Sequence, residues 1–88
     1  MKIVEYEVIK KINDLEAQVD KVLESHKEEM FHRRISYFIN FSGAWKKCRN
    51  ELTKLEGKVD NRIFCLYYEK LCRMYPKIVD YMLLGGGR

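Results

Sequence analysis

The chain contains a single proline and only five glycines, three of which stand together near its end. Proline and glycine are the residues that most often interrupt regular secondary structure, so their scarcity argues against a fold built from many turns and loops. Lysine, glutamate, leucine and isoleucine are abundant instead. This composition is typical of an all-α protein.

Long hydrophobic runs are also missing. No segment approaches the roughly 18 consecutive apolar residues that cross a bilayer as a helix. Glu5 and Glu7 stand where a secretory signal would need an unbroken apolar core. We therefore expect no contact with a membrane and a cytoplasmic location.

Cysteine is present without the spacing that gives it a function. Cys48, Cys65 and Cys72 form no C-x-x-C pair, and an odd number of cysteines suits a disulfide framework poorly. The seven-residue separation of Cys65 and Cys72 is too long for one tetrahedral zinc site without further ligands. A reducing compartment and small, partly buried thiols are expected.

Catalytic motifs are absent as well. The sequence has no glycine-rich phosphate loop, nucleophile elbow or H-E-x-x-H pair. Glu29 and His32 form one E-x-x-H pair, but helical di-metal sites repeat that pair and add glutamates from other helices. We expect no enzyme activity, no catalytic residue, no cofactor and no metal site.

The most regular feature that is present is a series of apolar residues spaced alternately by three and four. This apolar ladder comprises Phe38, Phe41, Trp45, Cys48, Leu52, Leu55 and Val59. A shorter leader stripe has the same spacing and comprises Val8, Ile12, Leu15, Val19 and Val22. Such spacing runs down one side of a helix and requires a partner helix. It predicts a helical hairpin or small helical bundle with coiled-coil-like packing.

Self-association is expected because a chain of 88 residues buries only a small core by itself. The alternation of Ile12, Leu15 and Val19 resembles the core of parallel dimers. Ile9 and Leu23 widen the stripe, which leaves other orders open. We predict a homo-oligomer, most simply a dimer, with an interface formed by Val8, Ile12, Leu15, Val19, Val22, Phe38, Phe41, Trp45, Leu52 and Leu55.

The expected organisation is one helical domain over residues 1–84, followed by a flexible tail at 85–88. Its helices are predicted at about residues 2–24, 26–56, 61–74 and 77–84 from the apolar period and the helix-end signals. Ser25 and Glu28 match a capping box for the second helix.

Three positions decide where the later helices break. The unbroken ladder favours a continuous helix through residues 42–44, and its backward extension places Phe31 on the same seam. Gly57 suits a helix C-terminus and Asp60 suits the cap of the next helix. Pro76 lacks a backbone N–H and fits the first turn of a further helix.

Charge divides the chain into an acidic leader and a basic body. Residues 1–30 carry five lysines and eight acidic residues, a net charge of −3, whereas residues 31–88 carry twelve basic and five acidic residues, a net charge of +7. The heptad phase places a polar row on the outward face, comprising Arg33, Asn40, Lys47, Lys54 and Asn61, with Lys46 beside it. Successive members rise by about 10.5 Å along a helix.

Such a basic row can neutralise phosphates and bind nucleic acid without reading its bases. The candidate binding residues are Arg33, Lys46, Lys47, Lys54 and Arg62. Exposed aromatic rings would favour single strands, although most rings here belong to the ladder or its flanks and are expected in the core, with Tyr37 and Tyr68 as exceptions.

Two other interpretations remain open. In the first, the lysines form only the solvated outer face of an ordinary helix, and the acidic leader folds against the basic body and cancels part of its field. Exposed ion pairs of this kind contribute only about 0–1 kcal/mol each to stability. Alternatively, the amphipathic helices bind a helix of another protein, as an adaptor, assembly factor or inhibitor would. The preferred hypothesis is a non-enzymatic, self-associating protein that binds nucleic acid, with the protein-interaction module as the alternative.

Overall fold

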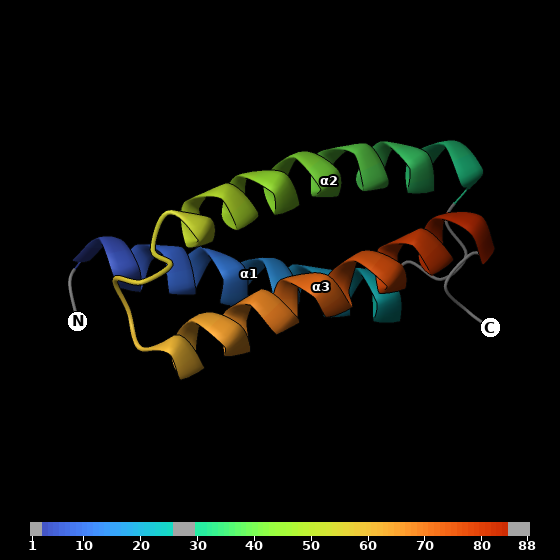
Figure 1. Ribbon diagram of the computed structural model, residues 1–88. Helices are drawn as coiled ribbons and strands as arrows, with labels where there is room; N and C mark the ends of the chain where they lie inside the picture. Colours follow the sequence, from blue (N-terminus) through green and yellow to red (C-terminus); the bar gives the residue numbers. More distant parts are fainter. Residues whose placement is uncertain (1–2, 26–29, 85–88) are drawn as a thin grey trace.

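The computed structural model describes residues 3–25 and 30–84, which form three helices packed into a small bundle (Figure 1). They are α1 (Ile3–Ser25), α2 (Phe31–Thr53) and α3 (Asn61–Leu84). The middle helix runs antiparallel to the other two (Figure 1). The expectation of an all-α helical bundle is therefore confirmed.

The core of the bundle lies where the three helices face one another. Each helix contributes apolar side chains at helical spacing, and the buried set comprises Val8, Ile12, Leu15, Val19, Phe41, Cys48, Leu52, Leu55, Leu71, Met74, Ile78 and Tyr81. Burying one large aliphatic side chain contributes about 1.5–3 kcal/mol. The leader stripe and the apolar ladder thus meet inside a single chain, and α3 adds a third apolar stripe.

The second helix is continuous through residues 42–44, as predicted, but it is shorter than expected at both ends. Ser25 is the last residue of α1 and so does not cap the second helix. That helix begins at Phe31 after Met30, whose extended backbone lacks a side-chain cap. Glu28, the other half of the predicted capping box, lies outside the described residues.

A turn connects α2 to α3. Gly57 has a φ of +80°, in the left-handed region that glycine enters without steric cost. The Asp60 carboxylate accepts a hydrogen bond from the Arg62 backbone N–H at 2.8 Å, which caps α3. Both the predicted break after Gly57 and the capping role of Asp60 are confirmed.

The apolar ladder continues beyond the end of α2. Leu55 is buried and Val59 is half-buried, although both follow Thr53. The Leu55 N–H bonds to the Leu52 carbonyl at 2.9 Å, and the Lys58 N–H bonds to the Leu55 carbonyl at the same distance. These i to i+3 bonds keep the chain turning in a helical sense. The three- and four-residue spacing of the ladder therefore still places Leu55 and Val59 towards the core after the regular helix has ended.

The predicted start of a new helix at Pro76 is wrong, because α3 runs unbroken from residue 61 to residue 84. Proline inside a helix costs about 3 kcal/mol, since it removes one hydrogen bond and crowds the preceding turn. Pro76 is exposed, while Met74, Ile78 and Tyr81 are buried on either side of it. Their burial offsets the local cost and holds both halves of α3 against the core.

The predicted tail at residues 85–88 lies outside the described part of the chain. Over residues 3–25 and 30–84, none of the helices combines the length and the apolar character that crossing a bilayer requires.

Candidate functional site

Acidic and basic side chains are concentrated on different helices. Among its described residues α1 carries six acidic side chains and three lysines, whereas α2 carries five basic side chains and one acidic residue, Glu51. No aspartate or glutamate occurs from Met30 to Asn50. The bundle therefore places one acidic and one basic helix next to each other.

The predicted polar row does face outward. Its five members, Arg33, Asn40, Lys47, Lys54 and Asn61, are all exposed. The two lysines on this row also line grooves between α1 and α2. The acidic leader, packed as α1, therefore lies directly beside the C-terminal half of the basic row.

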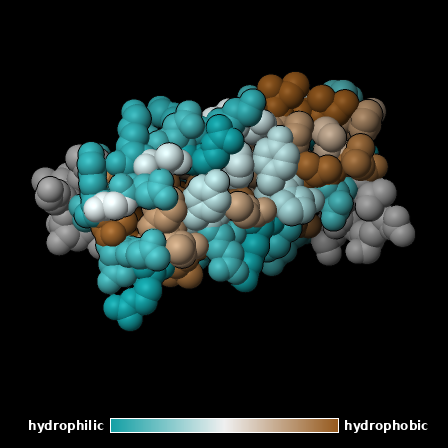
Figure 2. Space-filling model, viewed as in Figure 1, coloured by the Kyte–Doolittle hydropathy of each residue, from teal (hydrophilic) through white to brown (hydrophobic). Residues whose placement is uncertain are grey.

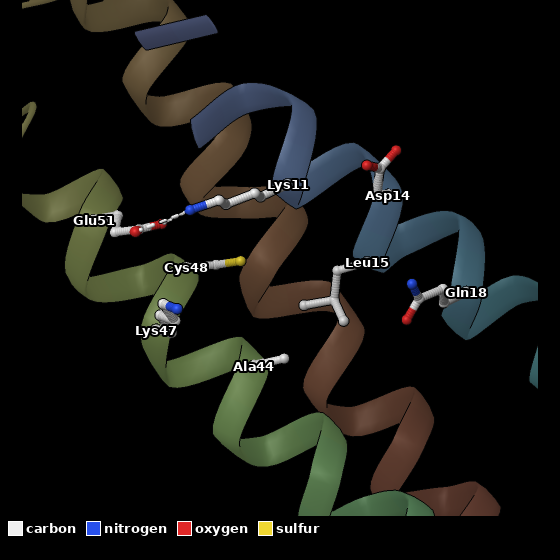
Figure 3. A pocket seen from close by; sticks show the side chains of 8 residues that line it. All are labelled: Lys11, Asp14, Leu15, Gln18, Ala44, Lys47, Cys48 and Glu51. Carbon is white, nitrogen blue, oxygen red and sulfur yellow. Dashed lines mark hydrogen bonds and ion pairs between the residues drawn. The ribbon is translucent and has the colours of Figure 1, made fainter. Parts of the chain in front are cut away.

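The first of these grooves, about 250 Å³ in volume, is shown in Figure 3. Its apolar lining comes from Leu15, Ala44 and Cys48, and the small Ala44 side chain leaves space between the helices. Five polar side chains complete the lining, namely Lys11, Asp14, Gln18, Lys47 and Glu51. This mixture of charges is poorly suited to an anion or a cation alone.

The Lys11 ammonium of α1 lies 3.2 Å from the Glu51 carboxylate of α2 (Figure 3). This ion pair uses a lysine of the acidic helix and the acidic residue of the basic helix. A second groove, of about 350 Å³, brings Glu7 together with Lys54 and Lys58. Carboxylates of α1 thus accompany Lys47 and Lys54 and reduce the positive field on that side.

Cys48 lies buried at the first groove. Burial raises the pKa of its thiol above the ordinary value, and the nearby Glu51 carboxylate raises it further, whereas Lys11 and Lys47 lower it. The thiol therefore stays protonated at neutral pH and packs as a small apolar group. Cys65 and Cys72 are free and exposed, unlike the partly buried thiols that we expected.

The remaining predicted cations occupy different places. Lys46 is exposed and follows Trp45, whose indole bonds to α3, and the Arg49 guanidinium lies 5.3 Å from the centre of the Trp45 ring. Arg62 is exposed at the start of α3 and pairs with Asp60 at 3.4 Å. The five candidate residues are therefore all exposed, but they do not form one continuous row.

Most aromatic rings are structural, as expected. Phe38, Phe41 and Trp45 gather around Tyr75, with ring centres 5.0 to 5.9 Å away. Tyr37 is half-buried against Tyr81, and burial raises the pKa of its hydroxyl. The prediction of an exposed Tyr37 ring is therefore wrong.

Three rings of the described residues remain accessible, and the most exposed is Tyr6 of α1, at 60%. Tyr68 is 40% exposed and stacks on Phe64 at 5.7 Å. Phe31 is 51% exposed, so its predicted place on the buried seam is wrong. It stands at the first residue of α2, where the Arg34 guanidinium lies 5.4 Å from its ring centre.

An exposed apolar surface covers the first half of α2 and the end of α3 (Figure 2). Its large side chains are 51–65% exposed, and this apolar end comprises Met30, Phe31, Ile39 and Leu83. The Arg34 Nε–H donates to the Met82 carbonyl at 3.2 Å and joins the two helices there. The spacing of Phe31, Ile35 and Ile39 by four residues, which departs from the ladder phase after Phe31, is the sequence signal for this surface.

The predicted oligomer interface is used within one chain. Seven of its members are buried there, namely Val8, Ile12, Leu15, Val19, Phe41, Leu52 and Leu55, while Val22, Phe38 and Trp45 are half-buried. Self-association through these residues stays a prediction. Because they are already packed, a dimer formed through them would require the chains to exchange helices.

No three His, Cys, Asp or Glu side chains of residues 3–25 and 30–84 are grouped so that they could hold a metal ion. Glu29 of the E-x-x-H pair is outside those ranges. No protein-family model, curated protein or solved structure matches the chain. Its function is therefore inferred from geometry and charge.

Proposed function

We propose that this protein binds nucleic acid without enzymatic activity and contacts the phosphates through the exposed cations of α2. The observation that carries the proposal is the sorting of charge between the helices. Arg33, Lys46 and Lys47 are exposed on a segment of α2 that contains no carboxylate from residue 30 to residue 50. A helical segment that carries cations and no carboxylate is a suitable partner for a polyanion.

The spacing of these cations suits a phosphate backbone. Arg33 and Lys47 are fourteen residues apart on one helix, which corresponds to about 21 Å along its axis. Contacts of this kind release condensed counterions, so affinity falls steeply with salt and carries little base specificity.

The α3 side of α2 is the more favourable place for the contact. Arg49 lies against Trp45, whose indole bonds to α3. Neither Lys46 nor Arg49 lines the two grooves in which carboxylates of α1 accompany Lys47 and Lys54. The exposed Tyr68 ring of α3 and the exposed Phe31 ring of α2 offer faces on which unpaired bases could stack. We therefore expect single strands to bind more tightly than duplexes of equal length.

The test is a charge reversal with a matched control. The variant Lys46→Glu, Lys47→Glu, Lys54→Glu changes exposed lysines of α2 and the following turn, whereas Lys10→Glu, Lys21→Glu, Lys77→Glu changes three exposed lysines of α1 and α3. Both have the same net charge. Single- and double-stranded oligonucleotides are titrated at two salt concentrations, with circular dichroism to verify the helical fold.

We expect the α2 variant to lose at least about tenfold in affinity and most of its salt dependence, and the control to lose much less. Equal losses would show that only net charge matters and would contradict a binding surface on α2. Absence of binding by the unmodified protein at low salt would reject the proposal and favour the protein-interaction alternative.

A further inference from the structure

Carboxylates of α1 lie beside lysines that the nucleic-acid contact would use. Asp14 of α1 and Lys47 of α2 line the first groove between these helices (Figure 3). Glu7 of α1 lines the second groove together with Lys54 and Lys58. Each groove therefore places a carboxylate of the acidic helix close to a lysine of the basic body.

These acidic and basic groups are close without being paired. Lys11 and Glu51, which line both grooves, neutralise each other at 3.2 Å. Over residues 3–25 and 30–84, no ion pair involves the other charged groups at issue, all of them exposed, namely Glu7, Asp14, Lys47 and Lys54. A phosphate can therefore reach the two lysines, but only within the field of the two carboxylates.

Such a field acts differently on duplexes and single strands. A duplex carries one negative charge per about 1.7 Å of its axis, whereas each of its strands alone carries one per about 3.4 Å. Exposed charges interact over a Debye length, about 10 Å at 0.1 M salt, so a fixed carboxylate repels more phosphates of a duplex than of a single strand. A row of lysines alone would favour the duplex for the same reason, and carboxylates beside the lysines oppose that advantage.

We propose that Glu7 and Asp14 determine the strand selectivity of this protein, by opposing the attraction of duplex phosphates to Lys47 and Lys54. This inference rests on the nucleic-acid binding proposed above and gives α1 a part in it. Stacking on exposed rings raises the affinity for single strands, whereas the two carboxylates lower the affinity for duplexes. The two sources of selectivity are therefore separable by mutation.

A pair of isosteric variants tests the proposal. The groove variant is Glu7→Gln, Asp14→Asn. The control variant is Asp20→Asn, Glu24→Gln, which removes the same charge from exposed positions of α1 that line neither groove. Fluorescence anisotropy gives the dissociation constants for single- and double-stranded oligonucleotides of equal length at two salt concentrations, and circular dichroism verifies the fold.

We expect the groove variant to raise the duplex affinity at least about fivefold and the single-strand affinity at most about twofold. The control should leave the ratio of the two dissociation constants unchanged, and the effect of the groove variant should shrink at the higher salt. A ratio that the groove variant changes no more than the control does would overturn this inference while nucleic-acid binding itself stands. Binding by neither the unmodified protein nor the groove variant would instead reject both.

A double-mutant cycle tests whether the carboxylates act through the lysines. In a protein that already carries Lys47→Gln and Lys54→Gln, neutralising Glu7 and Asp14 should change the ratio of dissociation constants by less than half as much as in the unmodified protein. An undiminished change in this background would overturn the part that we assign to Lys47 and Lys54.

Discussion

The Trp45 indole N–H of α2 donates a hydrogen bond to the backbone carbonyl of Leu71 in α3, across 2.6 Å. Leu71 is itself buried, so this bond joins the two helices within the packed part of the bundle. The same indole meets the Tyr75 ring edge to face, with the ring centres 5.0 Å apart and the ring planes at 66°. One side chain of the apolar ladder thus provides both a polar and an aromatic contact to α3.

Replacing Trp45 with phenylalanine should separate these two contributions. The variant keeps an aromatic ring but loses the donor, and we expect the free energy of unfolding to fall by about 1–3 kcal/mol. Urea denaturation followed by circular dichroism measures the change. Tyr75→Phe, which keeps its ring, is the control and should change stability less. No loss in Trp45→Phe would contradict a structural role for the bond.

The two glycines of known conformation predict opposite effects of alanine. A methyl group at Gly43 or at Gly57 would meet no other atom within 4 Å, so crowding does not distinguish them. Gly43 is helical, and Gly43→Ala should stabilise the fold by about 0.5–1 kcal/mol. Gly57 has a positive φ, and Gly57→Ala should destabilise it by about 1–2 kcal/mol. Thermal denaturation of both variants tests the pair, and shifts of the same sign would refute it.

Pro76 gives a prediction of increased stability. Alanine at this exposed position restores the N–H that can bond to the Cys72 carbonyl, so Pro76→Ala should raise stability by about 1–3 kcal/mol. In a domain of this size each kcal/mol corresponds to about 4–8 °C in melting temperature. Calorimetry measures the shift, with Lys77→Ala as an exposed neighbouring control. An unchanged melting temperature would mean that α3 pays no penalty at Pro76.

The cysteines should differ in reactivity. In the native protein, Cys65 and Cys72 are exposed and should react rapidly with a thiol reagent, whereas the buried Cys48 should react only slowly. The absorbance released by a chromogenic disulfide reagent gives the number of thiols that react in the fast phase and in the slow phase. Three rapid thiols would show that the groove between α1 and α2 opens readily.

The raised pKa of Cys48 also predicts a dependence of stability on pH. Above the ordinary thiol pKa, roughly 8.5, the unfolded chain loses this proton while the folded chain keeps it, so the free energy of unfolding must fall as pH rises. Below that value the contribution is fully present. Urea denaturation at neutral and alkaline pH measures the loss, and Cys48→Ala should reduce it. An equal loss in that variant would assign the effect to other groups.

Periodicity predicted the core well because it depends on the geometry of a single helix. The phase of Phe41, Cys48 and Leu52 identified the buried side of α2. It could not identify which helix would cover that side. The partner that seemed to require a second chain is supplied by α1 and α3 of the same chain, which a local pattern does not record.

The features that the sequence did not predict have a common cause, since each depends on how separate parts of the chain pack together. Pro76 lies within a helix because Met74 and Ile78 anchor it to the core. Phe31 continues the ladder phase but stands at the end of the bundle, where it remains exposed. Lys47 faces outward as predicted, yet only the fold places Asp14 in the same groove.

The sorting of charge gives the bundle an electric dipole across its short axis. Among the described residues α1 has a net charge of −3 and α2 a net charge of +4, and the two helices pack against each other. In the field of a polyanion such a dipole experiences a torque that turns α2 towards the polymer before the two meet. The carboxylates of α1 would then face outward, so one molecule would repel a second strand after capturing the first.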